Sequence, residues 1–299
     1  MKIGLALGSG SSRGWAHIGV IKALSEIGIQ PDIVCGSSIG ALVGASYISN
    51  NLHKLQEWTC SLTRLQLARF FEINASLNGF VDKERFQEFL NEYVVNEEAL
   101  IEEQSKQFAA VATELTTGRE IWLSDGLVHD AVWASISLPG LFPPISNKGK
   151  WLVDGGLVNP VPVSVCRAFG ADVVIAVNLN GDIVGKHLRR NRQPQLPEEP
   201  DVLSRISDFV KNHSYWETDT TKQDDSAPNL IDAIASSINI AQDRITRSRL
   251  AGDPPDILLS LKLSHIGLLE FYRAREVIAE GEKAVRRISS EIQDILGVL

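Results

Sequence analysis

The sequence predicts an α/β protein with a mainly parallel central sheet and helices on both faces of the sheet. Short apolar runs of strand length alternate with longer segments of helical periodicity, which is the pattern of parallel α/β folds. The run Asp172–Asn178 is apolar in its interior, as is typical of a central parallel strand. The chain has 299 residues, 44% of them hydrophobic, so it can bury the core of one large domain.

The first half of the chain alternates strands with helices. Small residues dominate segment 39–49, so a helix there can pack tightly on a sheet. Asp82 is the expected N-cap of a helix that carries Phe86, Phe89 and Leu90. In order, we expect a strand at 2–8, a helix at 15–26, a strand at 33–35, a helix at 39–49, mostly helical residues at 51–105, strands at 108–115 and 120–123 joined by a hairpin turn at 116–119, and a helix at 128–136.

The second half continues this alternation after a strand at 151–153. Pro160 and Pro162 open a helix at 161–169, and Gly170 closes it. Apolar residues recur at helical spacing from 231 to 245, and again from 274 to 295 as one stripe on a long C-terminal helix. The remaining strands are expected at 172–178 and 256–262.

Composition and charge exclude several classes of protein. A formal net charge of -8 argues against a general affinity for nucleic acid. The three cysteines, Cys35, Cys60 and Cys166, have no metal-ligand spacing and form no disulfide pattern, which fits a reducing compartment. The N-terminus is too short for a signal peptide, and no apolar run reaches the roughly 20 residues that span a bilayer. We therefore expect a cytoplasmic protein that meets a membrane, if at all, from the aqueous side.

The strongest functional signal is Ser38, which lies in a G-x-S-x-G motif formed with Gly36 and Gly40. The motif follows the apolar run at 33–35 and precedes helix-forming residues, so it matches the strand–turn–helix context of a nucleophile elbow. The N-terminus of the following helix favours negative charge at the site. Ser38 is therefore the predicted nucleophile of an acyl transfer reaction.

Two further loops carry residues that such a nucleophile needs. The first strand ends in a glycine-rich loop, which lies beside the Ser38 turn if the first two strands are parallel neighbours. Its backbone N–H groups are candidate oxyanion donors, and Arg13 either braces the loop or attracts an anionic head group. Asp154 follows another apolar strand and precedes Gly155 and Gly156, so it is a candidate base if burial raises its proton affinity. The predicted oxyanion loop comprises Gly8, Gly10, Ser11, Ser12, Arg13 and Gly14.

Three other functions fit parts of the pattern. The glycine loop alone also suits a dinucleotide, but that fold expects an acidic residue at the end of the second strand, where this chain has the Ser38 motif. An α/β-hydrolase would use a Ser-Asp-His triad, for which His265 is the candidate. In that fold several strands usually precede the elbow, whereas Ser38 follows only the second strand of this chain. His17 is not taken as a triad residue and is interpreted as a packed or surface residue of the first helix. A protein that keeps the fold for regulation or partner binding, with little turnover, is the alternative to an enzyme.

These motifs together resemble those of patatin-like phospholipases, and most closely the bacterial RssA-type branch. The glycine loop ending at Gly14, Ser38 in its elbow, the segment Ser137–Pro144 and Asp154-Gly155-Gly156 occur in the order seen in that family. The resemblance implies a three-layer α/β/α fold and a Ser–Asp dyad with Ser38 as nucleophile and Asp154 as base, without a histidine, metal or cofactor. It departs from the family pattern at Ser9 and Ser11, which interrupt the glycine run and tolerate positive φ less well than glycine.

The residue pattern and the resemblance together give the expected organisation and activity. We expect a catalytic core at 1–180, a partly flexible polar insertion at 181–228 with a short helix near 203–210, and C-terminal helices and a last strand at 229–299 that pack on the core as part of a single domain. The predicted activity is serine-dependent hydrolysis of a lipid or acyl ester, with peripheral membrane contact and oligomer formation left open.

Overall fold

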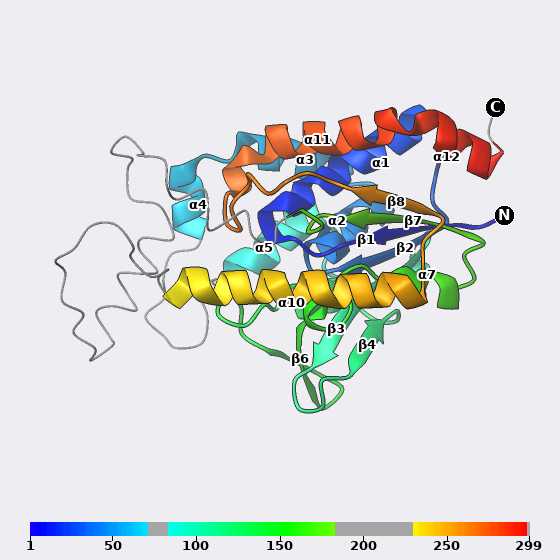
Figure 1. The fold of residues 1–299 in the computed structure, drawn as a ribbon. Helices are drawn as coiled ribbons and strands as arrows, with labels where there is room; N and C mark the ends of the chain where they lie inside the picture. Colours follow the sequence, from blue (N-terminus) through cyan, green and yellow to red (C-terminus); the bar gives the residue numbers. More distant parts are fainter. Residues whose placement is uncertain (71–82, 183–229, 298–299) are drawn as a thin grey trace, which may run out of the picture.

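The structure is a computed structural model that describes residues 1–70, 83–182 and 230–297. Within these ranges the chain forms three layers, with helices on both sides of an eight-stranded sheet (Figure 1). The strand order is β5-β6-β3-β2-β1-β7-β8, and β4 pairs with β3 outside this path. The predicted α/β/α fold class with a mainly parallel sheet is therefore confirmed.

Five neighbouring strands of the sheet are parallel, and the rest form an antiparallel extension. The parallel strands are β1 (Ile3–Leu7), β2 (Ile33–Ser37), β3 (Gln107–Glu114), β7 (Val173–Asn178) and β8 (Ile257–Ser260). The antiparallel ones are β4 (Glu120–Leu123) and β6 (Lys150–Asp154), both paired with β3, and β5 (Ile145–Asn147), paired with β6.

Alternating side chains of the sheet enter two cores, one on each face. Leu5 and Leu7 join the larger core with helices α1 (Ala16–Glu26), α2 (Ile39–Ile48) and α11 (Ala274–Arg287), whereas Ala6 joins the smaller core with α7 (Val163–Ala168). Figure 1 shows α1 and α11 together on one side of the sheet and the long helix α10 (Leu230–Gly252) on the other.

Helices α3 (Leu52–Ser61), α4 (Arg64–Phe70), α5 (Lys83–Tyr93) and α6 (Val128–Ile136) contribute residues near the Ser38 turn. Helix α12 (Ser289–Leu296) lies at the other end of the sheet, beside the N-terminus (Figure 1). Short 3-10 turns lie at Ser11–Trp15, Ile101–Glu103, Gly155–Leu157 and Phe271–Arg273. Where residues 51–105 are described, they are mostly helical as predicted. The proposed N-cap Asp82, the helix near 203–210 and almost all of the polar insertion lie outside the described residues.

Two elements differ from the sequence expectation. The C-terminal apolar stripe is not one helix, because Ile288 leaves helical geometry with φ -124 and ψ 22 and separates α11 from α12. Strand β5 was not expected, because its three residues are too few to form a pattern. In the hairpin that joins it to β6, Lys148 and Gly149 both have positive φ, and Gly149 is typical of a two-residue hairpin turn.

Strands β2 and β6 lie end to end along one edge of β3. Ala110 pairs with both β2 and β4, and Thr113 pairs with both β4 and β6, so β4 occupies the opposite edge from the other two. Ser37 of β2 pairs with Val111, and the next residue of β3, Ala112, pairs with Asp154 of β6. The sheet itself therefore places the residue after β2 beside Asp154.

Among the described residues, no helix combines the length and the apolar character that crossing a membrane requires.

Candidate active site

Ser38 occupies the sharp turn between β2 and α2. Its backbone has φ 55 and ψ -126, a conformation that L-residues rarely adopt and that the nucleophile elbow requires. The N–H of Ser38 donates to Ser135 Oγ at 2.9 Å, which ties the turn to helix α6. Ser38 is also the N-cap of α2, so the positive end of the helix dipole lies at the site. The turn thus exposes the hydroxyl where developing negative charge is stabilised.

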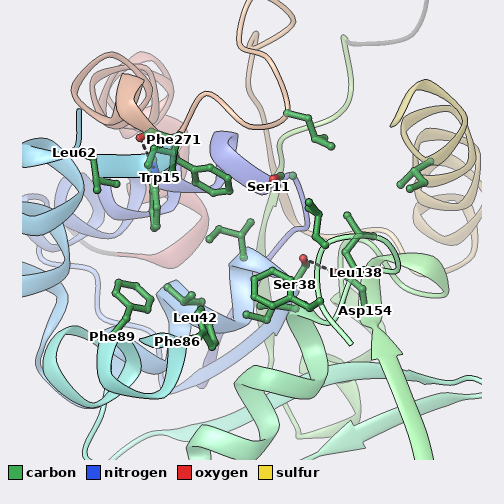
Figure 2. Close-up of a pocket in the computed structure, with 18 of the residues that line it drawn as sticks. Ser11, Trp15, Ser38, Leu42, Leu62, Phe86, Phe89, Leu138, Asp154 and Phe271 are labelled. Atoms are coloured by element: carbon green, nitrogen blue, oxygen red, sulfur yellow. Dashed lines mark hydrogen bonds between the residues drawn. The ribbon is translucent and has the colours of Figure 1, made fainter. Parts of the chain in front are cut away.

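Asp154, the last residue of β6, accepts the hydrogen bond of the Ser38 hydroxyl. Ser38 Oγ donates to Asp154 Oδ2 at 2.5 Å (Figure 2). The other carboxylate oxygen, Oδ1, accepts the N–H of Gly156 at 2.7 Å. The backbone of Asp154 is held by Ser137 O, 3.0 Å from its N–H, and by Thr113 Oγ1, 2.8 Å from its carbonyl oxygen. The structure therefore brings the predicted nucleophile and base into contact.

Burial raises the pKa of Asp154 from 3.8 to about 6, because the side chain loses the water that stabilises its charge. The hydrogen bonds from Ser38 and from the N–H of Gly156 act in the opposite direction and limit the rise. A carboxylate with this pKa is ionised at neutral pH but binds a proton more readily than an ordinary aspartate. This combination is what a general base needs.

The glycine loop lies beside the Ser38 turn, as expected from the parallel pairing of β1 with β2. Gly10 and Ser11 line the same pocket as Ser38. Within the described part of the chain, no acceptor contacts the backbone N–H of Gly10, of Ser11 or of Ile39, the residue after Ser38. Ser11 adopts a φ of 51, so the serine accepts the positive φ that glycine would adopt more easily. These N–H groups are free to donate to an oxyanion.

The rest of the predicted loop is engaged elsewhere. Ser12 donates from its N–H to Leu268 O at 3.3 Å and from Oγ to Gly267 O at 2.6 Å. Arg13 is buried, and its Nε donates to Ile266 O at 3.0 Å. Burial lowers the pKa of Arg13 to about 10. Of the two roles left open for Arg13, the contacts are those of a brace, and its side chain does not line the pocket.

His17 holds the start of the same loop. It is fully buried on α1, and its Nε2 donates to Gly8 O at 2.7 Å. Burial lowers the pKa of His17 to about 4, so the ring is neutral and carries its proton on the nitrogen that faces the carbonyl. The sequence suggested only a packed or surface residue, because spacing alone does not show which carbonyl a helix side chain reaches.

The glycines at the site allow close approach of neighbouring groups. A Cβ at Gly40 would lie 2.1 Å from Leu7 O, so α2 can contact the end of β1 only because residue 40 has no side chain. A Cβ at Gly156 would lie 2.6 Å from Gln242 Nε2 of helix α10. The other predicted glycines are as crowded, with a neighbouring atom within 2.8 Å of the Cβ position, and they are Gly8, Gly10, Gly14, Gly36 and Gly155.

An apolar pocket extends from the Ser38 hydroxyl between the surrounding helices (Figure 2). Figure 2 shows Leu62 and Phe89 on the side of the pocket opposite Ser38, with Leu42 between them and the serine. Six aromatic rings contribute to its wall: Trp15, Trp58, Phe86, Phe89, Phe142 and Phe271. Trp58 comes from α3, Phe89 from α5 and Phe271 from the turn before α11, so this wall exists only where these separate elements pack together.

Comparison with known proteins identifies the family. The family model described as "Patatin-like phospholipase" matches residues 5–167, which is more than half of the chain. The chain belongs to the patatin-like phospholipase family. The matched segment contains the glycine loop, the Ser38 elbow and Asp154. Helix α10, strand β8 and helix α11 lie outside it.

Individual members of the patatin-like phospholipase family extend this similarity. The chain is 31% identical over 324 residues to an NTE family protein of Mycobacterium tuberculosis, covering 94% of this chain and 89% of that one. It is 35% identical over 186 residues to a lysophospholipase, NTE1, of Coccidioides immitis, covering 59% of this chain and 11% of that one. It is 33% identical over 184 residues to human patatin-like phospholipase domain-containing protein 6, covering 59% of this chain and 13% of that one.

In this patatin-like phospholipase family member, none of the described histidines contacts Ser38 or Asp154. His265 lies on the loop before α11, where its Nε2 is 2.9 Å from Glu276 Oε1. His129 Nε2 is 2.8 Å from Val95 O, and the His53 side chain is exposed on α3 beside Glu57. The candidate triad histidine of the α/β-hydrolase hypothesis is therefore occupied elsewhere.

Proposed function

We propose that the protein is a serine lipid acyl hydrolase that uses Ser38 and Asp154 as a catalytic dyad. One observation carries the proposal: the Ser38 hydroxyl donates a 2.5 Å hydrogen bond to a buried carboxylate at the mouth of an apolar pocket. The carboxylate is the base, and the pocket takes the acyl chain. Membership of the patatin-like phospholipase family supports lipid hydrolysis independently of this geometry.

The reaction has two steps on this arrangement. Asp154 accepts the proton of Ser38 while Oγ attacks the ester carbonyl carbon, and the alcohol leaves with that proton. Water then attacks the acyl-enzyme, again giving its proton to Asp154, and the fatty acid is released. The N–H groups of Gly10, Ser11 and Ile39 hold the negative oxygen in both steps. Removing one such donor typically raises the barrier by about 3 to 4 kcal/mol.

The proposed substrates are phospholipids, lysophospholipids or related acyl esters. The lysophospholipase name of the Coccidioides relative supports this class. We keep three finer proposals from the sequence: membership of the RssA-type branch, a cytoplasmic location with peripheral membrane contact, and the division into a core at 1–180, a polar insertion and a C-terminal region that packs on the core.

A fluorophosphonate probe tests the proposal directly, because such probes phosphonylate only an activated serine. We expect one adduct on the folded wild-type protein, located at Ser38 by peptide mass spectrometry. Labelling should accompany release of fatty acid from lysophospholipid. A folded protein that forms no adduct and releases no fatty acid would favour the alternative, a regulatory or partner-binding protein that keeps the fold but not the chemistry.

Filling the far side of the pocket should change the preferred chain length. The substitution Leu62→Trp places a larger ring opposite Ser38 and shortens the space for an acyl chain. Each excluded methylene loses about 0.8 kcal/mol of burial, or roughly fourfold in kcat/KM. We expect activity on long-chain esters to fall by about tenfold or more while activity on butyrate esters stays near wild type. The measurement is kcat/KM across a series of p-nitrophenyl esters, and an equal change at all lengths would contradict the assignment of the pocket.

A further inference from the structure

Helix α10 buries a row of polar side chains near the catalytic end of the sheet, beside Ile238, which also lines the pocket. Asn239, Gln242, Asp243 and Thr246 recur at helical spacing and are all at most 6% exposed. Figure 2 shows this helix, in yellow, on the side of the pocket where Asp154 lies and away from Leu62 and Phe89. The acyl chain therefore has an apolar wall on one side of Ser38, and the polar row of α10 lies on the other.

Gln242 is the polar residue of this face that lines the pocket together with Ser38 and Asp154. Its Oε1 accepts a hydrogen bond from Asn180 Nδ2 at 3.2 Å, and the same Nδ2 donates to Ser9 O at 3.0 Å. Because Oε1 faces Asn180, the two N–H donors of Gln242 Nε2 point away from Asn180. Gln242 is thus fixed to the backbone of the glycine loop.

The donors of Gln242 have no acceptor among the described residues. Gln242 Nε2 is not one of the fully buried polar atoms, so within the pocket this donor is open to a water or a substrate oxygen. The position that a Cβ would take at Gly156 shows where the amide lies. It is 2.6 Å from Gln242 Nε2 and 2.9 Å from Asp154 Oδ1. The amide and the catalytic carboxylate therefore border the same small space.

We propose that Gln242 is a further catalytic residue of the hydrolase, with its Nε2 holding the attacking water of the second step. The assignment rests on the proposed function. The water accepts a hydrogen bond from Nε2 and gives one proton to Asp154 while its oxygen bonds to the acyl carbon. The bond from that carbon to Ser38 Oγ then breaks, and the proton on Asp154 passes to Oγ. In the first step the leaving alcohol oxygen occupies the same position as this water, because Asp154 gives its proton to the alcohol and later takes one from the water.

The test separates the two steps with a p-nitrophenyl ester, whose leaving group needs little assistance. Stopped-flow release of p-nitrophenol gives the acylation rate, and decay of the acyl-enzyme mass after substrate removal gives the deacylation rate. In Gln242→Met, which keeps the side-chain length without the amide, we expect acylation within about threefold of wild type and deacylation slower by about tenfold or more. The matched control is Asn239→Leu, on the same buried face but outside the pocket, which should leave both rates unchanged.

Other outcomes overturn the assignment. Unchanged deacylation in Gln242→Met would do so, and so would an equal fall in both rates accompanied by slower fluorophosphonate labelling, which indicates a structural role. If Gln242→Met fails to fold, Gln242→Glu keeps the acceptor for Asn180 without the donor, and it must show the same selective loss. A wild-type protein that forms no adduct at Ser38 defeats the proposed function first, and the role of Gln242 falls with it.

Discussion

The substitution Ser38→Ala should reduce hydrolysis of every lipid ester by at least about 10³-fold, because it removes the only atom proposed to form the acyl-enzyme. Fluorophosphonate labelling should disappear in the same variant. The measurement is fatty acid release from a panel of phospholipids, lysophospholipids and short esters by wild type and variant side by side. Equal rates on every ester would refute the catalytic assignment.

A second variant at this position separates loss of chemistry from loss of fold. Ser38 has a φ of 55, which strains any residue with a Cβ. Ser38→Gly should therefore be inactive, and its free energy of unfolding should exceed that of Ser38→Ala by roughly 1 kcal/mol. Thermal or urea unfolding of the two inactive variants checks this order. An inactive but well-folded Ser38→Gly protein assigns the lost activity to the missing hydroxyl.

Replacing Asp154 with asparagine should lower kcat/KM by about 10² to 10⁴-fold, because an amide cannot accept the proton of Ser38. In wild type, kcat/KM should rise about tenfold per pH unit below a pKa of about 6 and level off above it, because only the ionised carboxylate acts as base. The residual activity of the variant should lack this transition. A pH profile of both proteins on one ester provides the measurement, and a wild-type profile without a transition between pH 5 and 7 would contradict the role of Asp154.

The same substitution should stabilise the fold at neutral pH. Below pH 3.8 Asp154 is protonated in the folded and the unfolded chain, so the group costs nothing. Between 3.8 and about 6 the unfolded chain loses the proton first, so stability falls as the pH rises. Above about 6 the full cost of the buried charge, about 3 kcal/mol at 1.36 kcal/mol per pKa unit, is present. Asp154→Asn should be more stable than wild type at pH 7 by up to this amount and equal to it at pH 3.5, as measured by urea unfolding at both pH values.

The local signals in the sequence predicted much of the fold and singled out the two residues that we propose as the dyad. The Ser38 motif could be recognised in the sequence because an elbow needs small residues at fixed positions. At Gly40 a Cβ would lie too close to Leu7 O for any side chain to fit. Strand and helix alternation predicted the parallel sheet. Two errors concern short-range geometry: the break at Ile288, which no glycine or proline marks, and strand β5, whose three residues are too few to form a pattern.

Other parts of the site left no sequence signal, because they depend on contacts between distant segments. The pocket wall combines Trp58 from α3 with Phe271 near the C-terminal helices. His17 reaches a carbonyl nine residues earlier only because the 3-10 turn after Gly10 folds the loop back over α1. Gln242 lies on a helix that follows the polar insertion and is outside the segment matched to the family.

The sequence by itself determined that this chain carries an elbow serine, a glycine loop and a strand-end aspartate, because each is written in a few neighbouring residues. Only the tertiary structure decided that the serine and the aspartate meet, since β2 and β6 share one edge of β3 and place Asp154 beside the residue that follows Ser37. It also decided the chemistry of the pair. The proton affinity of Asp154 and the orientation of the Gln242 amide depend on burial and on partners from elsewhere in the chain, which local sequence does not encode.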